Sequence, residues 1–252
     1  MARRPARRGG DPDPSGSRPC ADRRFVSEMR RGETPPRIAS WPTEIRSIGL
    51  PSGPLELVAV RGLETLLDRD RLLADAGMEP PYWTLLWSGA ALLAAFLDRR
   101  EDLAGRTLFD AGCGLGLVTL AAARRGARVS AVDRNPDAVA FARVSAARLG
   151  LEVQIAVGDI GEYSEGRRFD WIAAAELLYE REDFARLASA FARSLAPGGR
   201  LVIADARRVR TEAFYEELER RGLAREAEEE TRVDEEGTLV RVCLSTWMAR
   251  RG

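Results

Sequence analysis

The 252-residue chain contains no lysine and no histidine, so all 39 of its basic residues are arginines. A Walker-type phosphate loop needs its lysine, a Schiff-base enzyme needs a side-chain amine, and a Ser-His-Asp triad needs an imidazole. Zinc hydrolases with an H-E-x-x-H motif are excluded for the same reason. These absences remove several of the commonest kinds of catalytic site from consideration.

Cysteine is also scarce, and no segment has the pattern of a membrane span. The three cysteines, Cys20, Cys113 and Cys243, are too far apart for a metal site. An odd number of separated cysteines is typical of a reducing compartment, and we expect Cys113 and Cys243 to be small packed residues, not catalytic thiols. No apolar run has the length of a secretory signal or of an uncharged membrane span. We therefore expect a cytoplasmic protein with no metal ion and no membrane partner.

Acidic and basic residues balance at 39 each, but they are unevenly distributed along the chain. Residues 1–37 contain ten arginines and five acidic residues with almost no apolar periodicity, which is typical of a disordered arm. Residues 38–79 hold short apolar runs, including 55–60 and 63–67, and predict a β-hairpin or small cap. Residues 80–252 have the length of one α/β domain.

Within residues 80–252, strand-like and helix-like segments alternate. The strands are expected near 107–111, 128–133, 152–158, 169–175 and 200–205, and the helices near 89–98, 117–125, 136–149 and 182–195. A helix near 211–221 and two strands, 226–233 and 238–248, complete the chain. This order predicts an α/β fold with a doubly wound, mostly parallel seven-stranded sheet that ends in an antiparallel hairpin.

Residues 107–136 read as strand, glycine loop, helix and second strand in one unit. The loop has the pattern Asp110-x-Gly112-x-Gly114-x-Gly116, and the second strand ends at Asp133. Glycines remove the β-carbons that would keep a ligand away from the backbone, and the following helix presents unpaired N–H groups to an anion. The pattern therefore predicts a nucleotide-cofactor site.

The third glycine of the dinucleotide fingerprint G-x-G-x-x-G is missing, because Leu117 or Thr119 stands where it would be. The acidic G-x-G-x-G form resembles the first motif of the Rossmann-like (class I) methyltransferases that use S-adenosylmethionine (SAM). The resemblance implies that the loop, Cys113 included, lies against the amino-acid end of SAM, and that Asp133 binds the ribose hydroxyls.

Four strands in succession end in an acidic residue: Asp110, Asp133, Asp159 and Glu176. Because ligands bind beyond the carboxyl ends of parallel strands, we expect these side chains to meet at one edge of the sheet. Asp159 and Ile160 would hold the adenine, and Ala175 lies next to the site. A helix N-cap or a surface turn is the structural alternative for each acid. A bound cation would explain a carboxylate at the end of the apolar strand before Glu176.

Three aromatic residues precede the first helix in the segment 80–89, PPYWTLLWSG. Together with the glycine loop, with an acid-x-x-Tyr sequence at Glu176 and Tyr179, and with a closing Ser-Thr-Trp at 245–247, the segment resembles the lysine methyltransferase family that includes the electron-transfer-flavoprotein β-subunit methyltransferases. The resemblance implies Trp87 against the cofactor and Glu176 and Tyr179 at the substrate nitrogen. The sequence departs from that family at Glu176 and at 204–208, which leaves the acceptor in doubt.

The leading hypothesis is a SAM-dependent N-methyltransferase that methylates a lysine side chain of a protein by direct in-line transfer. Glu176 would orient the neutral amine and Tyr179 would form a wall of its channel. Two alternatives stay open: a small-molecule N- or O-methyltransferase, and a SAM-fold module that binds partners without catalysis. DNA adenine methylation is disfavoured, because the Glu-Pro-Pro-Tyr at 79–82 follows no strand. We expect a monomer.

Overall fold

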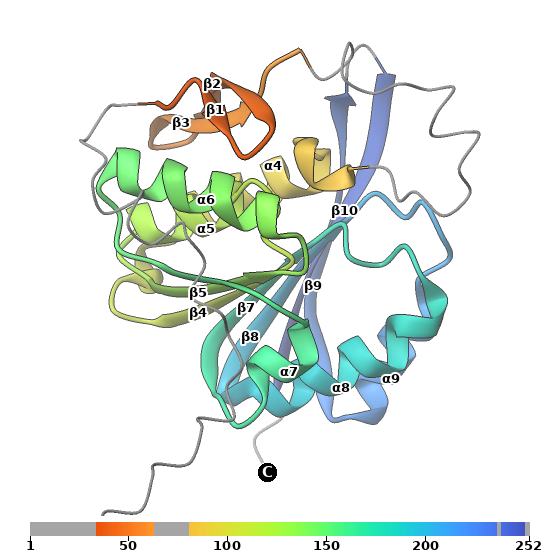
Figure 1. Ribbon diagram of the computed structural model, residues 1–252. Coiled ribbons are helices and arrows are strands. Elements are labelled where there is room, and N and C mark those ends of the chain that lie inside the picture. Colours follow the sequence, from red (N-terminus) through yellow and green to blue (C-terminus); the bar gives the residue numbers. More distant parts are fainter. Residues whose placement is uncertain (1–33, 63–80, 236–237, 250–252) are drawn as a thin grey trace, which may run out of the picture.

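The computed structural model describes residues 34–62, 81–235 and 238–249, which form an α/β fold around a seven-stranded sheet (Figure 1). The strands are β4 (Thr107–Ala111), β5 (Arg128–Asp133), β6 (Gln154–Val157), β7 (Phe169–Ala175), β8 (Leu195–Asp205), β9 (Leu223–Glu235) and β10 (Thr238–Ala249). Their order is β6-β5-β4-β7-β8-β10-β9, parallel from β6 to β8, with β10 antiparallel to both of its neighbours. The predicted doubly wound sheet with a C-terminal antiparallel hairpin is confirmed.

Two elements differ from the expectation. Strand β8 begins at Leu195 because this residue pairs with Phe169, and the register then shifts before Trp171 pairs with Arg200. A short helix, α7 (Ile160–Ser164), follows β6. Five residues are too few for a helical repeat to be visible in a sequence, so the pattern did not indicate this helix.

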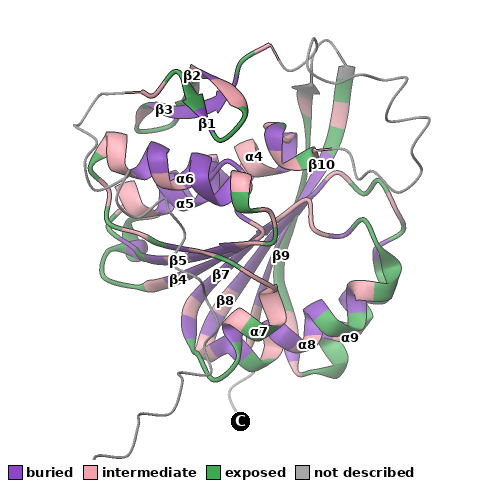
Figure 2. Ribbon diagram, viewed as in Figure 1, coloured by how far each residue is buried: buried purple, intermediate pink, exposed green. Residues whose placement is uncertain are grey.

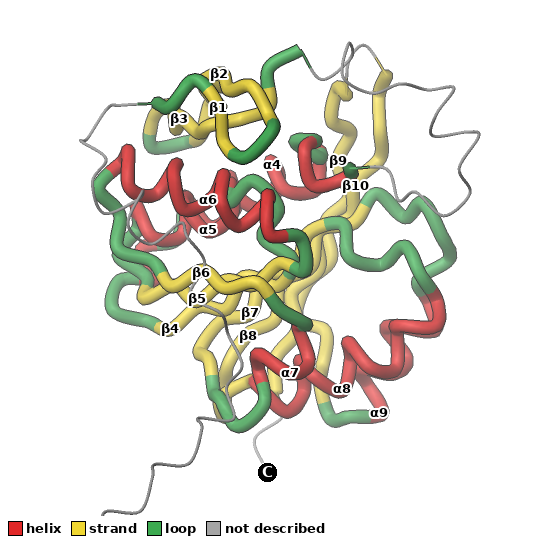
Figure 3. The backbone as a smooth tube through the Cα atoms, in the orientation of Figure 1, coloured by secondary structure: helices red, strands yellow, loops and turns green. Residues whose placement is uncertain are grey.

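Helices cover both faces of the sheet (Figures 1 and 3). One face carries α4 (Ser88–Asp98), α5 (Leu117–Arg124) and α6 (Pro136–Leu149), and the other carries α7, α8 (Phe184–Ser194) and α9 (Glu212–Arg220). In α8, Phe184, Leu187 and Phe191 recur at helical spacing and are buried. Helix α6 begins where the Asn135 side chain accepts two backbone N–H groups, and it ends at Gly150 in the left-handed conformation.

A second, three-stranded antiparallel sheet lies over α6 (Figure 1). It consists of β1 (Arg37–Ile38), β2 (Trp41–Leu50) and β3 (Gly53–Val60). The Val58 N–H donates to Ser145 Oγ of α6 at 2.9 Å. The buried Asp98 of α4 accepts from the Ser52 N–H and pairs with Arg124 of α5 at 2.8 Å. The small sheet is thereby joined to all three helices beneath it.

The small sheet accounts for the hairpin expected within residues 38–79. The strand-like run at 63–67 and most of the predicted arm lie outside the described residues. The segment boundaries at 37/38 and 79/80 therefore stay predictions.

The buried residues form one large apolar cluster on each face of the main sheet (Figure 2). Leu93, Leu120 and Phe141 pack on the side of α4, α5 and α6, and Phe191 and Phe214 pack on the side of α8 and α9. Since helices close both faces, the ends of the strands are where polar side chains can reach a ligand. In the part of the chain that the structure describes, no helix is both long and apolar enough to cross a membrane.

Candidate active site

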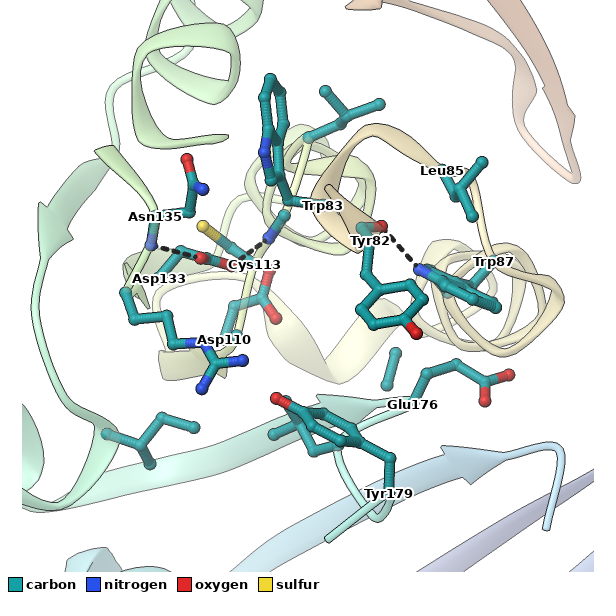
Figure 4. Close-up of a pocket in the computed structure, with 18 of the residues that line it drawn as sticks. Tyr82, Trp83, Leu85, Trp87, Asp110, Cys113, Asp133, Asn135, Glu176 and Tyr179 are labelled. Carbon is teal, nitrogen blue, oxygen red and sulfur yellow. Dashed lines mark hydrogen bonds between the residues drawn. The ribbon is translucent and has the colours of Figure 1, made fainter. Parts of the chain in front are cut away.

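A pocket of about 980 Å³ lies at the carboxyl edge of the parallel strands (Figure 4). Its wall is formed by residues at the ends of β4, β5, β6, β7 and β8, by the segment 81–90, and by Trp41 of β2. Small-molecule sites usually have volumes of about 300–1,000 Å³. This pocket is at the upper end of that range and has room for a cofactor with a second molecule beside it.

The glycine loop forms part of the wall, as predicted for residues 112–114. Gly112 has φ +73°, and a Cβ there would lie 2.5 Å from Leu177 Cδ2. Gly114 has φ +50°, and its Cβ would meet only Trp83 O at 3.7 Å. Any side chain at 112 would thus collide with the chain after β7, whereas at 114 the backbone itself is open to the pocket. Cys113 lies between them on the wall, and burial raises the pKa of its thiol.

Gly116 has a different position from the other loop glycines. It is the N-cap of α5 with φ +89°, and a Cβ there would lie 2.9 Å from Ala142 Cβ of α6. It does not line the pocket. The glycine at 116 is therefore explained by the close packing of α5 against α6, and the structure does not bring it to the other predicted cofactor residues.

Asp110 and Asp133 both line the pocket beside the glycine loop, as expected for the ends of neighbouring strands. Asp133 Oδ2 accepts the Gly114 N–H at 2.8 Å, and Asp133 Oδ1 accepts the Asn135 N–H at 2.9 Å. Asp133 thus fixes the loop as well as facing the pocket. Asp110 is buried beneath the loop and accepts the Thr119 hydroxyl at 2.5 Å. Burial raises the pKa of Asp110 to about 7.

Asp159 and Ile160 also line the pocket. Asp159 is the N-cap of α7, where its Oδ1 accepts the Gly161 N–H at 2.7 Å, and its Oδ2 pairs with Arg186. The structural alternative considered for this acid, a helix N-cap, is therefore present. The predicted contact of Asp159 and Ile160 with adenine stays a prediction.

Glu176 follows β7 in the left-handed conformation, with φ +53°. Its side chain is 8% exposed, its Oε2 lies 3.7 Å from Arg208 Nε, and its two oxygens accept the Gly89 N–H at 3.1 Å and the Ala206 N–H at 3.3 Å. Burial raises the pKa of Glu176. The start of α4, the chain after β8 and an arginine stabilise this buried carboxylate, so its burial is explained without a bound cation. A cation at Glu176 stays a prediction.

The aromatic residues of the segment 81–90 have two different roles. Trp83 packs between Trp41 and Phe141, with ring centroids 5.4 Å from each, which is the packing role expected for an aromatic residue near the core. Trp87 lines the pocket, and Arg208 lies over its ring at 4.7 Å from the centroid. Figure 4 places Trp87 near Glu176, at the end of the pocket away from Asp133. Its contact with the cofactor stays a prediction.

Tyr179 lies at the same end of the pocket as Glu176 and Trp87. The side chain lines the pocket with 43% of its surface exposed, beside Ala175 and Glu176 on the wall. Tyr82 is 49% exposed, and its backbone carbonyl accepts the Trp87 Nε1–H at 3.0 Å. The two tyrosines therefore stand at the mouth of the pocket.

Sequence reasoning missed several residues of the wall, among them Trp41, Asp205 and Arg208. Asp205 carried a usable signal, because it ends the fifth predicted strand just as the four selected acids end or follow theirs. Trp41 comes from a separate sheet, and no motif links it to the glycine loop. In the described ranges, no three side chains of the metal-ligating types lie close enough together to hold a metal ion.

Comparison with known proteins bears on this geometry. Residues 108–199 match the family described as "Methyltransferase domain". A ubiquinone biosynthesis O-methyltransferase of Xylella fastidiosa (strain M23) is 36% identical over 110 residues, which are 43% of this chain and 45% of the relative. The match thus spans less than half of the relative's length. The relative is named for O-methylation and not for protein lysine methylation, so the coarser resemblance, to class I SAM-dependent methyltransferases, is the one supported.

Two solved structures share the fold at sequence identities too low to show more than the fold. The N-methyltransferase NodS from Bradyrhizobium japonicum WM9, in complex with S-adenosyl-l-homocysteine, superposes with a TM-score of 0.56 at 20% identity over 72% of this chain and 98% of that chain. The T. thermophilus 16S rRNA N2 G1207 methyltransferase RsmC superposes with a TM-score of 0.59 at 21% identity over 86% and 53%. Residues 108–199 therefore match a methyltransferase domain, and the chain shares the fold of these two solved methyltransferases.

Proposed function

We propose that the protein transfers the methyl group of SAM to a small molecule, with a hydroxyl as the first candidate for the accepting group and an amine as the second. The observation that carries this proposal is the division of one pocket into two chemically different ends. The glycine loop and Asp133 form one end, and an apolar mouth around the buried Glu176 forms the other. The domain match and the O-methyltransferase relative support the same reaction class.

The residues at the loop end fit the cofactor. Gly114 leaves the backbone open, so that the amino-acid part of SAM can approach the start of α5, where unpaired N–H groups favour a carboxylate. Asp133 lies on the pocket wall, and a carboxylate can accept hydrogen bonds from two adjacent hydroxyls of a ribose. SAM supplies an activated sulfonium methyl group, so the protein has chiefly to align the acceptor. Such alignment accounts for about 7–11 kcal/mol of a barrier.

The acceptor end favours a molecule with an apolar body. Tyr82, Leu85 and Tyr179 are large side chains that stay exposed, and all three lie on the pocket wall (Figure 4). Exposed apolar groups gathered at the rim of a pocket are typical of ligand-binding sites. The polar groups below them, Glu176 and Arg208, would orient the polar part of the acceptor.

Methylation of a protein lysine is the second candidate. Its support is the acid-x-x-Tyr arrangement, because Glu176 and Tyr179 lie on one wall and a side chain could enter past the exposed Tyr179. Two observations weigh against lysine methylation. The oxygens of Glu176 already accept two backbone N–H groups, and the matched relative is an O-methyltransferase.

The test uses purified protein, methyl-labelled SAM, and an extract of the source cells that lacks this gene. After incubation, macromolecules and small molecules are separated and their label is counted. Label in the small-molecule fraction, lost with Glu176→Gln, supports the proposal. Label in a protein band supports the lysine hypothesis instead, and no label above that of the heat-denatured protein contradicts both.

A further inference from the structure

A second carboxylate lies beside Glu176 at the acceptor end of the pocket. Strands β7 and β8 pair in parallel with Ala175 opposite Ala204, so Glu176 and Asp205 occupy the same level at the ends of neighbouring strands. The Glu176 N–H donates to Ala204 O at 2.9 Å, which holds the two strand ends together. Asp205 is on the wall of the pocket.

Among the described residues, one oxygen of Asp205 has no hydrogen-bond partner. The residue is only 2% exposed, and its Oδ1 accepts the Arg207 N–H at 2.9 Å. Its Oδ2 is buried with no hydrogen-bond partner among the described residues. A buried acceptor without a partner costs about 1–3 kcal/mol, and more if it is charged, so native proteins keep few of them. This oxygen therefore points to a group that arrives with the ligand.

The other carboxylates of the pocket wall either accept a hydrogen bond, form an ion pair or are exposed. Both oxygens of Glu176 accept backbone N–H groups, and so do both oxygens of Asp133. Asp110 accepts from Thr119. The remaining four are Asp137, which accepts from Trp41 Nε1; Asp159 and Asp183, which pair with Arg186; and Glu180, which is exposed. Among the described acids of the wall, Asp205 alone combines burial with an unpartnered oxygen.

The charges around Asp205 leave its carboxylate available. The Arg207 guanidinium donates to Glu228 Oε1 at 2.9 Å and to Cys243 Sγ at 3.2 Å, and so is committed elsewhere. Arg208 lies close to Glu176. Burial raises the pKa of Asp205, although the positive charges of Arg207 and Arg208 oppose this effect. Glu176 and Tyr215 of α9 are further titratable groups near Asp205, and the negative charge of Asp205 contributes to the raised pKa of each.

We propose that Asp205 takes up the proton of a hydroxyl group on the acceptor during methyl transfer, and that the acceptor is therefore a hydroxyl-bearing small molecule. This inference rests on the proposed function. The chain has no histidine and no lysine, so a carboxylate is the natural proton acceptor here. Asp205 gains the hydroxyl proton while the acceptor oxygen bonds to the methyl carbon. The carbon–sulfur bond breaks with its electron pair left on sulfur, so a sulfonium and a carboxylate become a thioether and a carboxylic acid.

The burial of Asp205 Oδ2 is compatible with this role. Water does not reach the oxygen in the described structure, so bulk solvent does not compete for it. The terminal torsion of an aspartate is broad. A rotation about it, on binding of the acceptor, brings an oxygen to the pocket that Asp205 already lines.

The experiment compares the wild type with Asp205→Asn and, as the matched control, with Asp170→Asn, a carboxylate that accepts the Thr107 N–H at the opposite end of the strands and lies outside this pocket. The small-molecule fraction of the extract and methyl-labelled SAM serve as substrates, and the product is classed as a methyl ether or a methylamine. We expect Asp205→Asn to lower the formation of methyl ether by about 100-fold or more, with SAM affinity unchanged by calorimetry. Asp170→Asn should change neither quantity.

Two further readouts separate a proton acceptor from a merely structural residue. The wild-type rate should rise with pH through the pKa of Asp205 and then level off, and Asp205→Asn should lose this rise. The carboxyl of Asp205, followed by carbon-13 NMR and identified by its absence in Asp205→Asn, should titrate above the ordinary value of about 3.9. Asp205→Ser, which adds no volume, is the second variant if Asp205→Asn does not fold.

The results distinguish this inference from the proposed function. A wild type that neither binds SAM nor transfers label contradicts the proposed function itself. A wild type that is active while Asp205→Asn or Asp205→Ser keeps its rate and pH profile overturns only the role of Asp205. Label found solely as methylamine overturns the hydroxyl acceptor.

Discussion

Gly89, in the first turn of α4, donates its N–H to Glu176 Oε1 at 3.1 Å, and a Cβ at position 89 would lie 2.6 Å from that same oxygen. The missing side chain thus lets the start of a helix meet a carboxylate that follows a strand 87 residues later. The N–H groups and the dipole at a helix start stabilise a negative charge. The position of Glu176 therefore depends on glycine at 89.

Gly89→Ala should displace the Glu176 carboxylate. We expect methyl transfer to fall at least about tenfold, because a misplacement of about 1 Å at an active site can cost 100-fold. The free energy of unfolding should fall by about 1–3 kcal/mol from overpacking, less the better helix propensity of alanine. Turnover and urea unfolding measure the two effects. Gly49→Ala is the control, since a Cβ there meets nothing within 4 Å. A Gly89→Ala variant with unchanged turnover would show that the position of Glu176 is unimportant.

The glycine loop offers a paired test. Both positions have a positive φ that strains a side chain, but a Cβ at Gly114 meets only Trp83 O at 3.7 Å, whereas Gly116→Ala brings its Cβ within 2.9 Å of Ala142. We expect Gly114→Ala to weaken SAM binding more than it lowers stability. Gly116→Ala should chiefly lower the free energy of unfolding, by roughly 2 kcal/mol or more from strain and overpacking. Calorimetric titration with SAM and urea unfolding separate the effects, and the reverse order would contradict the assignment of Gly116 to packing.

Asp110 should make the unliganded protein less stable as the pH rises. Its pKa is raised to about 7 by burial in the folded protein and is near 3.8 when unfolded. The folded state therefore binds more protons between these values, and the stability present below pH 3.8 is lost as the pH rises through 7. The slope is at most about 1.4 kcal/mol per pH unit.

Asp110→Asn cannot ionise but still accepts the Thr119 hydroxyl. Urea unfolding at pH 5 and pH 8 should show a smaller loss of stability for the variant than for the wild type. The variant is compared with the wild type because Glu176 and Asp205 also have raised pKa values, so that both proteins lose stability as the pH rises. Equal losses in both proteins would mean that Asp110 is ionised throughout this range.

Much of the fold was predictable because its signals are local. The strand from Phe169 to Ala175 is apolar apart from Asp170, and the glycine loop and Asp133 mark where neighbouring strands end. Helix α7 was missed because it is short, and the early start of β8 was missed because Pro197 and the following glycines resemble a turn. The pairing of Leu195 with Phe169 is tertiary and leaves no periodic pattern.

The sequence predicted residues of the site only where the residue type itself indicates the position, as an acid at the end of an apolar strand does. Acids at strand ends were located correctly, but the partners that fix them were not. No sequence pattern relates Gly89 to Glu176, or Trp41 to the Asp137 carboxylate that accepts its Nε1–H at 2.8 Å. These contacts depend on how separate elements pack. The same limit explains why a cation was invoked for Glu176 when backbone N–H groups already stabilise it.

The most direct measurement is an equilibrium titration of the full-length protein with SAM. The account predicts binding at one site, weakened by roughly 10–100-fold in Asp133→Asn, because hydrogen bonds to a charged group contribute about 1.5–3 kcal/mol. Asp170→Asn is the matched control. Asp170 accepts the Thr107 N–H at 2.8 Å at the opposite end of the strands, so its loss should leave SAM affinity unchanged. A wild-type protein that does not bind SAM, or equal affinities for wild type and Asp133→Asn, would contradict the account.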